Sequence, residues 1–176
     1  GLSAPGPPRV FRQGADYGFA GERATVGGLR SYMDLALEEA RAAGDRGEVP
    51  VGAVVVAPSG AVVTRAGNRT RELNDPTAHA EVLAIRAACA LLGQERLVGH
   101  DLYVTLEPCA MCAAAISAAR IARLYYGAAD PKSGGVAVGA RVFAHPQCHH
   151  VPEVYDGIGG VEAEALLKAF FEARRA

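Results

Sequence analysis

Two cysteines three residues apart, Cys109 and Cys112, directly follow a proline that ends the apolar run Leu102–Leu106. We expect a strand to end before Pro108 and a helix to begin after it, so that both sulfurs lie on the first helical turn. Residues at i and i+3 share one helix face, with Cβ atoms about 5–6 Å apart. Two thiolates at this spacing can bind one metal ion, and the positive partial charge of a helix N-terminus favours the thiolate form. The pair therefore predicts half of a metal site.

The remaining ligand is predicted from His79-Ala80-Glu81, at the start of another helix. If the two helices lie side by side on a sheet, His79 converges with Cys109 and Cys112. Three protein ligands with an open fourth position are typical of a catalytic zinc site. The open position holds water, whose pKa zinc can lower from 15.7 to about 7. Glu81 can reach that water without binding the metal, and a carboxyl there suits proton transfer to a substrate nitrogen.

The CxxC motif alone has other interpretations, because structural zinc sites and redox pairs share it. A structural zinc site needs a fourth protein ligand, and none follows at the spacing of a zinc finger. The combination of H-x-E with P-C-x-x-C is the signature of zinc-dependent base deamination. A non-catalytic, zinc-stabilised interaction domain is the alternative from another class of protein. A second metal site at Cys148-His149-His150 is disfavoured, since adjacent histidines on an extended segment point to opposite faces.

The elements that must position these residues alternate between strands and helices. Apolar runs and turn residues predict strands over residues 51–57, 61–66, 101–106 and 123–127. Helical spacing predicts helices over residues 31–43, after the N-cap and proline at 75–76, over 109–119 and over 162–175. The pattern predicts an α/β sandwich, and the hairpin formed by the first two strands makes the sheet mixed.

The ends and faces of the helices give further expectations. Ser31, with Asp34 three residues later, resembles a capping box, and Gly44 is a stop signal. Two apolar stripes are expected to be buried, and they consist of Val82, Ile85, Cys89 and Leu92 in one helix and Leu166, Leu167, Phe170 and Phe171 in the last helix.

Length and composition predict one domain in a reducing compartment. The 176 residues can bury a substantial core, and the region rich in glycine and proline, residues 1–28, is expected to be a disordered tail before a domain over residues 29–176. Four unevenly spaced cysteines without a signal peptide favour a cytoplasmic protein. No apolar run approaches the roughly 20 residues that span a bilayer, so no membrane partner is expected. The net charge of −1 requires any nucleic-acid partner to bind a local patch.

With these motifs the sequence resembles the cytidine deaminase-like superfamily and, within it, the bacterial tRNA adenosine deaminases. The resemblance covers about Tyr32–Arg174 and rests on residues 49–53, Asn68, 75–81, 103–112, 129–132 and 167–174. It implies a three-layer α/β/α sandwich with a five-stranded mixed sheet, assembled as a homodimer with one zinc ion per subunit. The partner would be a tRNA anticodon loop.

The activity implied by the resemblance is the hydrolytic deamination of adenosine to inosine at the wobble position of a tRNA anticodon. It assigns proton transfer to Glu81, zinc binding to His79, Cys109 and Cys112, and substrate binding to Asn68, Ala80 and Asp130.

Two segments depart from the family pattern. Three alanines, residues 113–115, follow the second cysteine where the family often has a glycine, and residues 135–150 do not match the usual Gly-Ala-rich segment. Because the second segment borders the substrate side in the family, a deaminase of free nucleobases or nucleosides (guanine, cytosine or adenosine) is the alternative.

Overall fold

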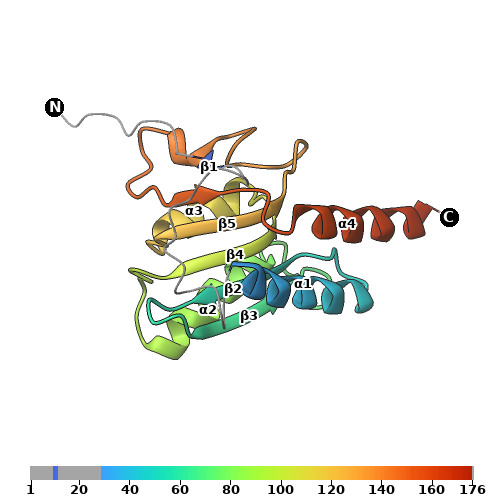
Figure 1. Cartoon of the computed structure of the whole chain (residues 1–176), viewed down its shortest axis with the longest axis horizontal. Helices are drawn as coiled ribbons and strands as arrows, with labels where there is room; N and C mark the ends of the chain where they lie inside the picture. The colour runs from blue at the N-terminus through green and yellow to red at the C-terminus, as the bar shows by residue number, and fades with distance from the viewer. Residues whose placement is uncertain (1–9, 12–28, 176) are drawn as a thin grey trace.

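A six-stranded mixed sheet forms the middle layer of the molecule (Figure 1). The computed structural model describes residues 10–11 and 29–175. The strands are β1 (Val10–Phe11), β2 (Gly52–Val56), β3 (Val62–Gly67), β4 (Asp101–Leu106), β5 (Arg123–Ala128) and β6 (Glu153–Tyr155). Their order across the sheet is β1-β6-β5-β4-β2-β3. Strand β2 is antiparallel to both β3 and β4, whereas β4, β5, β6 and β1 pair in parallel.

Helices cover both faces of this sheet. They are α1 (Leu29–Asp45), α2 (Ala80–Leu92), α3 (Ala110–Ala118) and α4 (Gly160–Arg175), with a short 3₁₀ helix, η1, at Val142–Ala144. Helices α2 and α3 pack on one face, while α1 and the start of α4 pack on the other. The predicted α/β/α sandwich is confirmed.

Alternation along the strands divides the core into two clusters. On β4, Leu102 and Val104 face α2 and α3, whereas Tyr103 faces α1. Tyr103 stacks on Tyr125, and Tyr125 stacks on Tyr155, with ring centroids 4.4 and 4.8 Å apart. The three tyrosines occupy paired positions on β4, β5 and β6. Offset aromatic pairs of this kind stabilise neighbouring strands beyond the area that they bury.

Four predicted strands agree with β2, β3, β4 and β5 to within one residue at each end. Strand β6 was not predicted. It has three residues and follows Pro152, so it is too short to show the alternation of apolar and polar residues by which a strand is recognised. Residues 1–9 and 12–28 of the predicted tail lie outside the described residues. Residues 10–11 form β1, which pairs with β6 and adds a sixth strand to the five that were expected.

Two helix starts differ from prediction. Helix α2 begins at Ala80 and not at residues 75–76, because Oδ1 of Asp75 accepts hydrogen bonds from the backbone N–H of Thr77 at 2.9 Å and from its hydroxyl at 2.7 Å. This local turn competes with helix formation. Helix α1 begins at Leu29, before the predicted cap Ser31, and continues through Gly44.

The buried stripes are also only partly correct. In α2, Ile85 is buried, but Val82 and Cys89 are half-buried and Leu92 is exposed. In α4, Ala163 is the one buried residue among those described, and Phe171 is exposed. Figure 1 shows why: α4 runs beyond the ends of the strands, so the sheet covers only its first turns. Within the described residues, no helix combines the length and apolar character needed to cross a membrane.

Replacing two glycines of this fold with alanine should change the free energy of unfolding in opposite directions. A Cβ at Gly52 would collide with the backbone of α1, at the carbonyl oxygen of Ala36 and 2.6 Å from the amide nitrogen of Ala40. Gly52→Ala should therefore lower the free energy of unfolding by about 1–3 kcal/mol or more. Gly44 lies in α1, where a Cβ would meet Pro50 at an ordinary 3.4 Å, so Gly44→Ala should raise it by about 0.5–1 kcal/mol. Urea unfolding of both variants tests the packing of β2 on α1, and equal effects would contradict it.

Candidate metal centre and active site

The strand directions bring the predicted site residues to one edge of the sheet. Because β2 is antiparallel to β3 and to β4, those two strands run in the same direction, and β5 runs with them. Asn68, Glu107 and Ala129 follow β3, β4 and β5, respectively. The carboxyl ends of parallel strands are where α/β proteins bind ligands. The chain segments that carry the candidate ligands all start from this edge.

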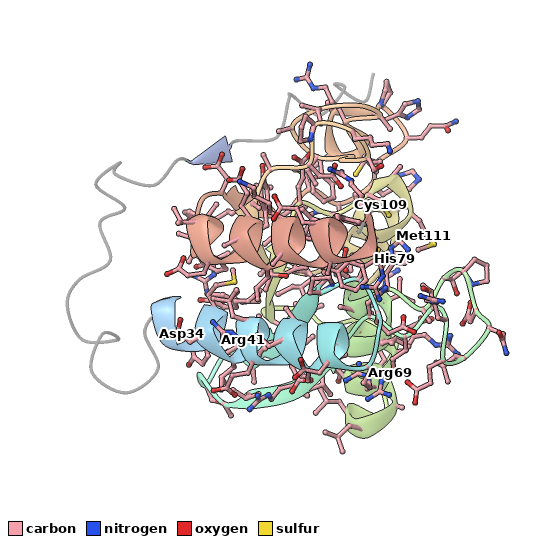
Figure 2. The ribbon with its side chains drawn as sticks, turned by 90° about the vertical axis from the view of Figure 1, so that its right-hand side faces the viewer. Asp34, Arg41, Arg69, His79, Cys109 and Met111 are labelled. Atoms are coloured by element: carbon pink, nitrogen blue, oxygen red, sulfur yellow. The ribbon has the colours of Figure 1, made fainter. Side chains whose placement is uncertain are left out.

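The three candidate ligands meet at the starts of two helices. His79 is the N-cap residue of α2 and Cys109 is the N-cap residue of α3, both with extended backbone angles. Cys112 lies in the first turn of α3 and is fully buried. In Figure 2 His79 and Cys109 lie close together on one side of the molecule.

The distances among these side chains suit a zinc ion. Nδ1 of His79 lies 3.6 Å from Sγ of Cys109 and 3.4 Å from Sγ of Cys112, and all three ligand atoms lie within 4.8 Å of one another. Tetrahedral coordination with Zn–S near 2.3 Å and Zn–N near 2.0–2.1 Å separates nitrogen from sulfur by about 3.5 Å. The observed distances and the donor set therefore fit a zinc ion with one coordination position left for water.

The contacts among the candidate ligands also favour a thiolate at one of the two cysteines. A hydrogen bond with Cys112, followed by one with His79, lowers the pKa of Cys109 to about 4. The same contact with Cys109, followed by burial, raises the pKa of Cys112. The hydrogen bond with Cys109 raises the pKa of His79. Cys109, the more exposed thiol, therefore ionises first, and a divalent cation would stabilise both thiolates.

Glu81 lies beside the ligands without belonging to them. Its side chain is buried, and this burial is the main cause that raises its carboxyl pKa above the usual range, while a hydrogen bond with Cys112 opposes the shift. A carboxyl with a raised pKa takes up a proton more readily than an ordinary carboxylate, as suits a general acid or base. The start of α2 thus presents both a candidate metal ligand, His79, and a candidate proton-transfer group, Glu81.

The residues expected to bind substrate surround this centre. The backbone N–H of Arg69, which follows Asn68, donates to the carbonyl of Ala78 at 3.0 Å and so holds the end of β3 beside His79. Asn68 is only 7% exposed, yet its side-chain amide makes no hydrogen bond with another described residue. Ala80, the first residue of α2, is fully buried. The amide of Asn68 is therefore available to an incoming ligand.

Asp130 shapes a turn after β5. Its Oδ1 accepts hydrogen bonds from the backbone N–H groups of Lys132 and Ser133 at 3.2 and 3.0 Å. Its own N–H donates to the carboxylate of Glu107 at 3.2 Å. Glu107 and Glu48 are buried carboxylates that were not predicted from the sequence. The one feature that could have indicated the burial of Glu107 is its position between the apolar run of β4 and the P-C-x-x-C motif.

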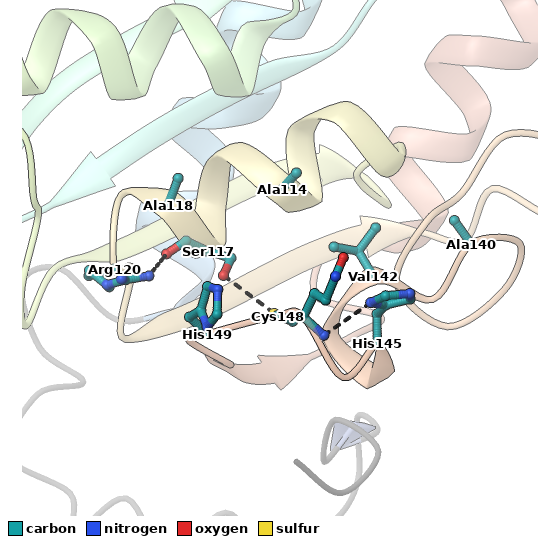
Figure 3. A pocket seen from close by; sticks show the side chains of 10 residues that line it. Ala114, Ser117, Ala118, Arg120, Ala140, Val142, His145, Cys148 and His149 are labelled. Carbon is teal, nitrogen blue, oxygen red and sulfur yellow. Dashed lines mark hydrogen bonds between the residues drawn. The ribbon is translucent and has the colours of Figure 1, made fainter. Parts of the chain in front are cut away.

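A separate pocket lies against α3, about 500 Å³ in volume (Figure 3). Its lining includes Cys148 and His149, but none of the three metal ligands. Cys148 Sγ contacts Ser117 Oγ at 3.3 Å, and His150 Nε2 lies 2.6 Å from the carbonyl of Ile121. Across the described part of the chain, one group of side chains is arranged to hold a metal, and Cys148, His149 and His150 are not in it. These contacts are structural, in agreement with the sequence analysis.

The ligand geometry predicts which cysteines retain zinc. Cys109→Ser should reduce the zinc content of the purified protein from about one ion per chain to near zero, because a serine hydroxyl is a poor substitute for a thiolate. Cys148→Ser, which changes a thiol outside the ligand group, should leave the zinc content unchanged. Metal analysis by mass spectrometry measures both. A Cys109→Ser protein with full zinc would contradict the ligand set.

Known proteins are similar to this chain in sequence and in fold. The pattern of the cytidine and deoxycytidylate deaminase zinc-binding region matches residues 28–128. A tRNA-specific adenosine deaminase of Agrobacterium fabrum is 63% identical over 144 residues, 82% of this chain and 94% of that protein. The tRNA-specific adenosine deaminase of Bacillus subtilis is 42% identical over 144 residues, 82% of this chain and 89% of that protein.

A solved structure from work on A-to-I editing by tRNA:A34 deaminases at the wobble position superposes with a TM-score of 0.77 and 64% identity. It covers 78% of this chain and 99% of the solved chain. The chain therefore belongs to the zinc-binding cytidine and deoxycytidylate deaminase family and, within it, to the tRNA-specific adenosine deaminases.

Proposed function

We propose that this protein catalyses the zinc-dependent hydrolytic deamination of adenosine to inosine at the wobble position of a tRNA anticodon. The observation that carries the reaction type is a buried carboxyl, Glu81, beside three convergent candidate ligands. The substrate is supported by the high identity to tRNA-specific adenosine deaminases over nearly their whole length. A cytoplasmic location, expected from the sequence, fits a tRNA substrate.

In the proposed mechanism the protein moves protons and holds the base. Bound zinc, held by the three ligands, would supply a water of lowered pKa for attack on C6 of the adenine. Glu81 takes a proton from the attacking water and delivers it to the ring nitrogen. It then takes a second proton from the new hydroxyl on C6 and delivers it to the amine, so that the C6–N bond breaks and the C6 carbonyl of inosine forms. Water and adenosine thus give inosine and ammonia. The burial that raises the pKa of Glu81 favours its protonated form, which suits a group that must accept a proton and then deliver it.

The side chains around the metal centre provide the base-binding pocket. We assign a hydrogen bond with the flipped base to the side-chain amide of Asn68, because this amide is nearly buried and has no partner among the described residues. Ala80 forms part of the pocket wall at the start of α2, and the Asp130 turn lies on the RNA side. A base in an anticodon loop is already partly unstacked, so it costs less to extrude than a base in a duplex.

Glu81→Gln should retain zinc and lose turnover. Glutamine has nearly the same shape but cannot carry the proton, and the loss of a general acid–base group reduces the rate by about 10²–10⁴-fold. Conversion of adenosine to inosine in an anticodon stem-loop measures kcat, and metal analysis measures zinc. Glu95→Gln, a matched change at an exposed glutamate beyond α2, should keep full activity. A Glu81→Gln protein with near-normal turnover would refute the proton-transfer role.

The substrate class has its own test. The zinc-loaded protein is incubated with an anticodon stem-loop that bears adenosine at the wobble position and, separately, with free adenosine, guanine and cytosine. We expect inosine in the stem-loop only. Conversion of free bases or nucleosides without conversion of the stem-loop would establish the alternative activity, since the zinc chemistry is the same.

We further propose that the protein is a homodimer that packs through the pocket face of α3. Ala114 and Ala118 are exposed one turn apart on this helix, and both line the mainly apolar pocket in Figure 3. Small residues at this spacing let another surface approach the helix closely, and covering such a patch removes apolar area from water.

Light scattering at micromolar concentration should give twice the mass of one chain. Ala118→Arg places a charge on the proposed interface and should give the mass of a monomer. Ala90→Arg, a matched change at an exposed alanine of α2, should leave the dimer intact. A monomeric unmodified protein would exclude the homodimer, and a dimer that tolerates Ala118→Arg would exclude this face.

A further inference from the structure

Glu107 is a buried carboxylate whose partners in the described structure are backbone amides. It is 2% exposed and lies two residues before the candidate ligand Cys109. Its Oε1 accepts the N–H of Asp130 at 3.2 Å, and its Oε2 accepts the N–H groups of Val136 and Ala137 at 3.2 and 3.1 Å. It makes no ion pair with any residue that the structure describes. Burying a charge without a counter-ion is costly unless several hydrogen bonds compensate it.

The three donors lie at the two ends of residues 130–137, within the longer loop that joins β5 to η1. Asp130 begins a turn after β5, and Val136 and Ala137 follow that turn. One carboxylate therefore closes the segment 130–137, because one oxygen binds its start and the other binds its end. We call this segment the Asp130 loop.

The Asp130 loop lies directly on the metal-binding segment. The N–H of Gly135 donates to the carbonyl of Pro108 at 2.8 Å. A Cβ at Gly135 would lie 2.5 Å from the amide nitrogen of Ala110 and 2.8 Å from the carbonyl carbon of Cys109. The loop backbone at Gly135 thus lies so close to the start of α3 that no side chain would fit at this position. Glu107 fixes the loop against the residues that hold the metal.

We propose that Glu107 is a positioning residue that holds the Asp130 loop in register with the zinc site, so that the loop presents a preformed surface to the RNA substrate. This role rests on the proposed function. Glu107 itself touches neither the base nor the metal, and it acts through the loop. A preformed loop avoids the cost of ordering the chain when substrate binds. Loss of Glu107 should therefore weaken substrate binding more than it slows the chemical step.

Glu107→Gln tests the proposal in the full-length, zinc-loaded protein. The amide keeps one acceptor oxygen but turns an NH₂ group toward a backbone N–H, so that one end of the loop is released. With the anticodon stem-loop as substrate we expect KM to rise about tenfold or more and kcat to change less than threefold, with zinc content unchanged. Asp101→Asn is the matched control. It removes the negative charge of a carboxylate that accepts a hydrogen bond from Nε of Arg123 at 2.9 Å, at the opposite end of β4, and should lower stability without changing KM.

A double-mutant experiment distinguishes a positioning role of Glu107 from general destabilisation of the protein. If Glu107 acts through the Asp130 loop, Glu107→Gln should raise KM much less in an Asp130→Ala background than in the unmodified protein. An exposed loop residue offers a second variant if Glu107→Gln does not fold: Ala137→Pro removes one of the three donors and should also raise KM.

Three results would overturn the positioning role. They are an unchanged KM in Glu107→Gln with only a lower melting temperature, a loss of zinc that accounts for the lost activity, and full additivity with Asp130→Ala. Failure of the unmodified protein to convert the stem-loop would instead overturn the proposed function, so the two failures are distinguishable.

Discussion

The convergence of His79, Cys109 and Cys112 is the constraint on which the rest of the structure depends. The ligand atoms lie within 4.8 Å of one another although His79 is 30 residues from the first cysteine in sequence. The sheet meets this requirement because β3 and β4 run in the same direction and end at the same edge. Each helix then starts with an extended N-cap residue, so that the ligand side chain projects ahead of the helix. A change in the direction of either strand would separate the ligands by the length of the sheet.

Buried carboxylates serve distinct purposes around this centre. Glu81 is held with few compensating contacts, and its raised pKa keeps it able to exchange protons. Glu107 accepts three backbone N–H groups, and Glu48 accepts those of Arg71 and Glu72. The surroundings of Glu81 favour reactivity. Those of Glu107 and Glu48 favour rigidity, because a carboxylate that accepts several backbone hydrogen bonds stabilises the loop around it. The three residues are all glutamates, and they differ in how many backbone N–H groups donate to the carboxylate.

The metal site could be predicted from the sequence because its ligands stand in two short motifs at helix starts. That the two helix starts meet depends on the strand directions, which the spacing within each motif does not determine. The start of α2 was misplaced, since the turn at Asp75 uses a side-chain acceptor that competes with the helix. The apolar face of α4 was assumed to be covered, but periodicity records only that a face is apolar and not what lies against it. The role of Glu107 was beyond sequence reasoning, because its donors lie 23 to 30 residues away and depend on how the loop closes.

The contrast between short motifs and long-range packing also separates the type of reaction from the choice of substrate. In the proposed mechanism the metal ligands and Glu81 act on the water and on the reacting carbon and nitrogens of the base, so they do not by themselves distinguish one base from another. The contacts that distinguish RNA from a free base would then lie where the chain meets the rest of the nucleotide, and we place them beyond Asn68 and along the Asp130 loop. That loop is joined to the metal segment by backbone hydrogen bonds, so its shape and the position of the zinc ligands are not independent. Under the proposed function, substrate choice would therefore depend on the order of this loop as well as on the identity of its side chains.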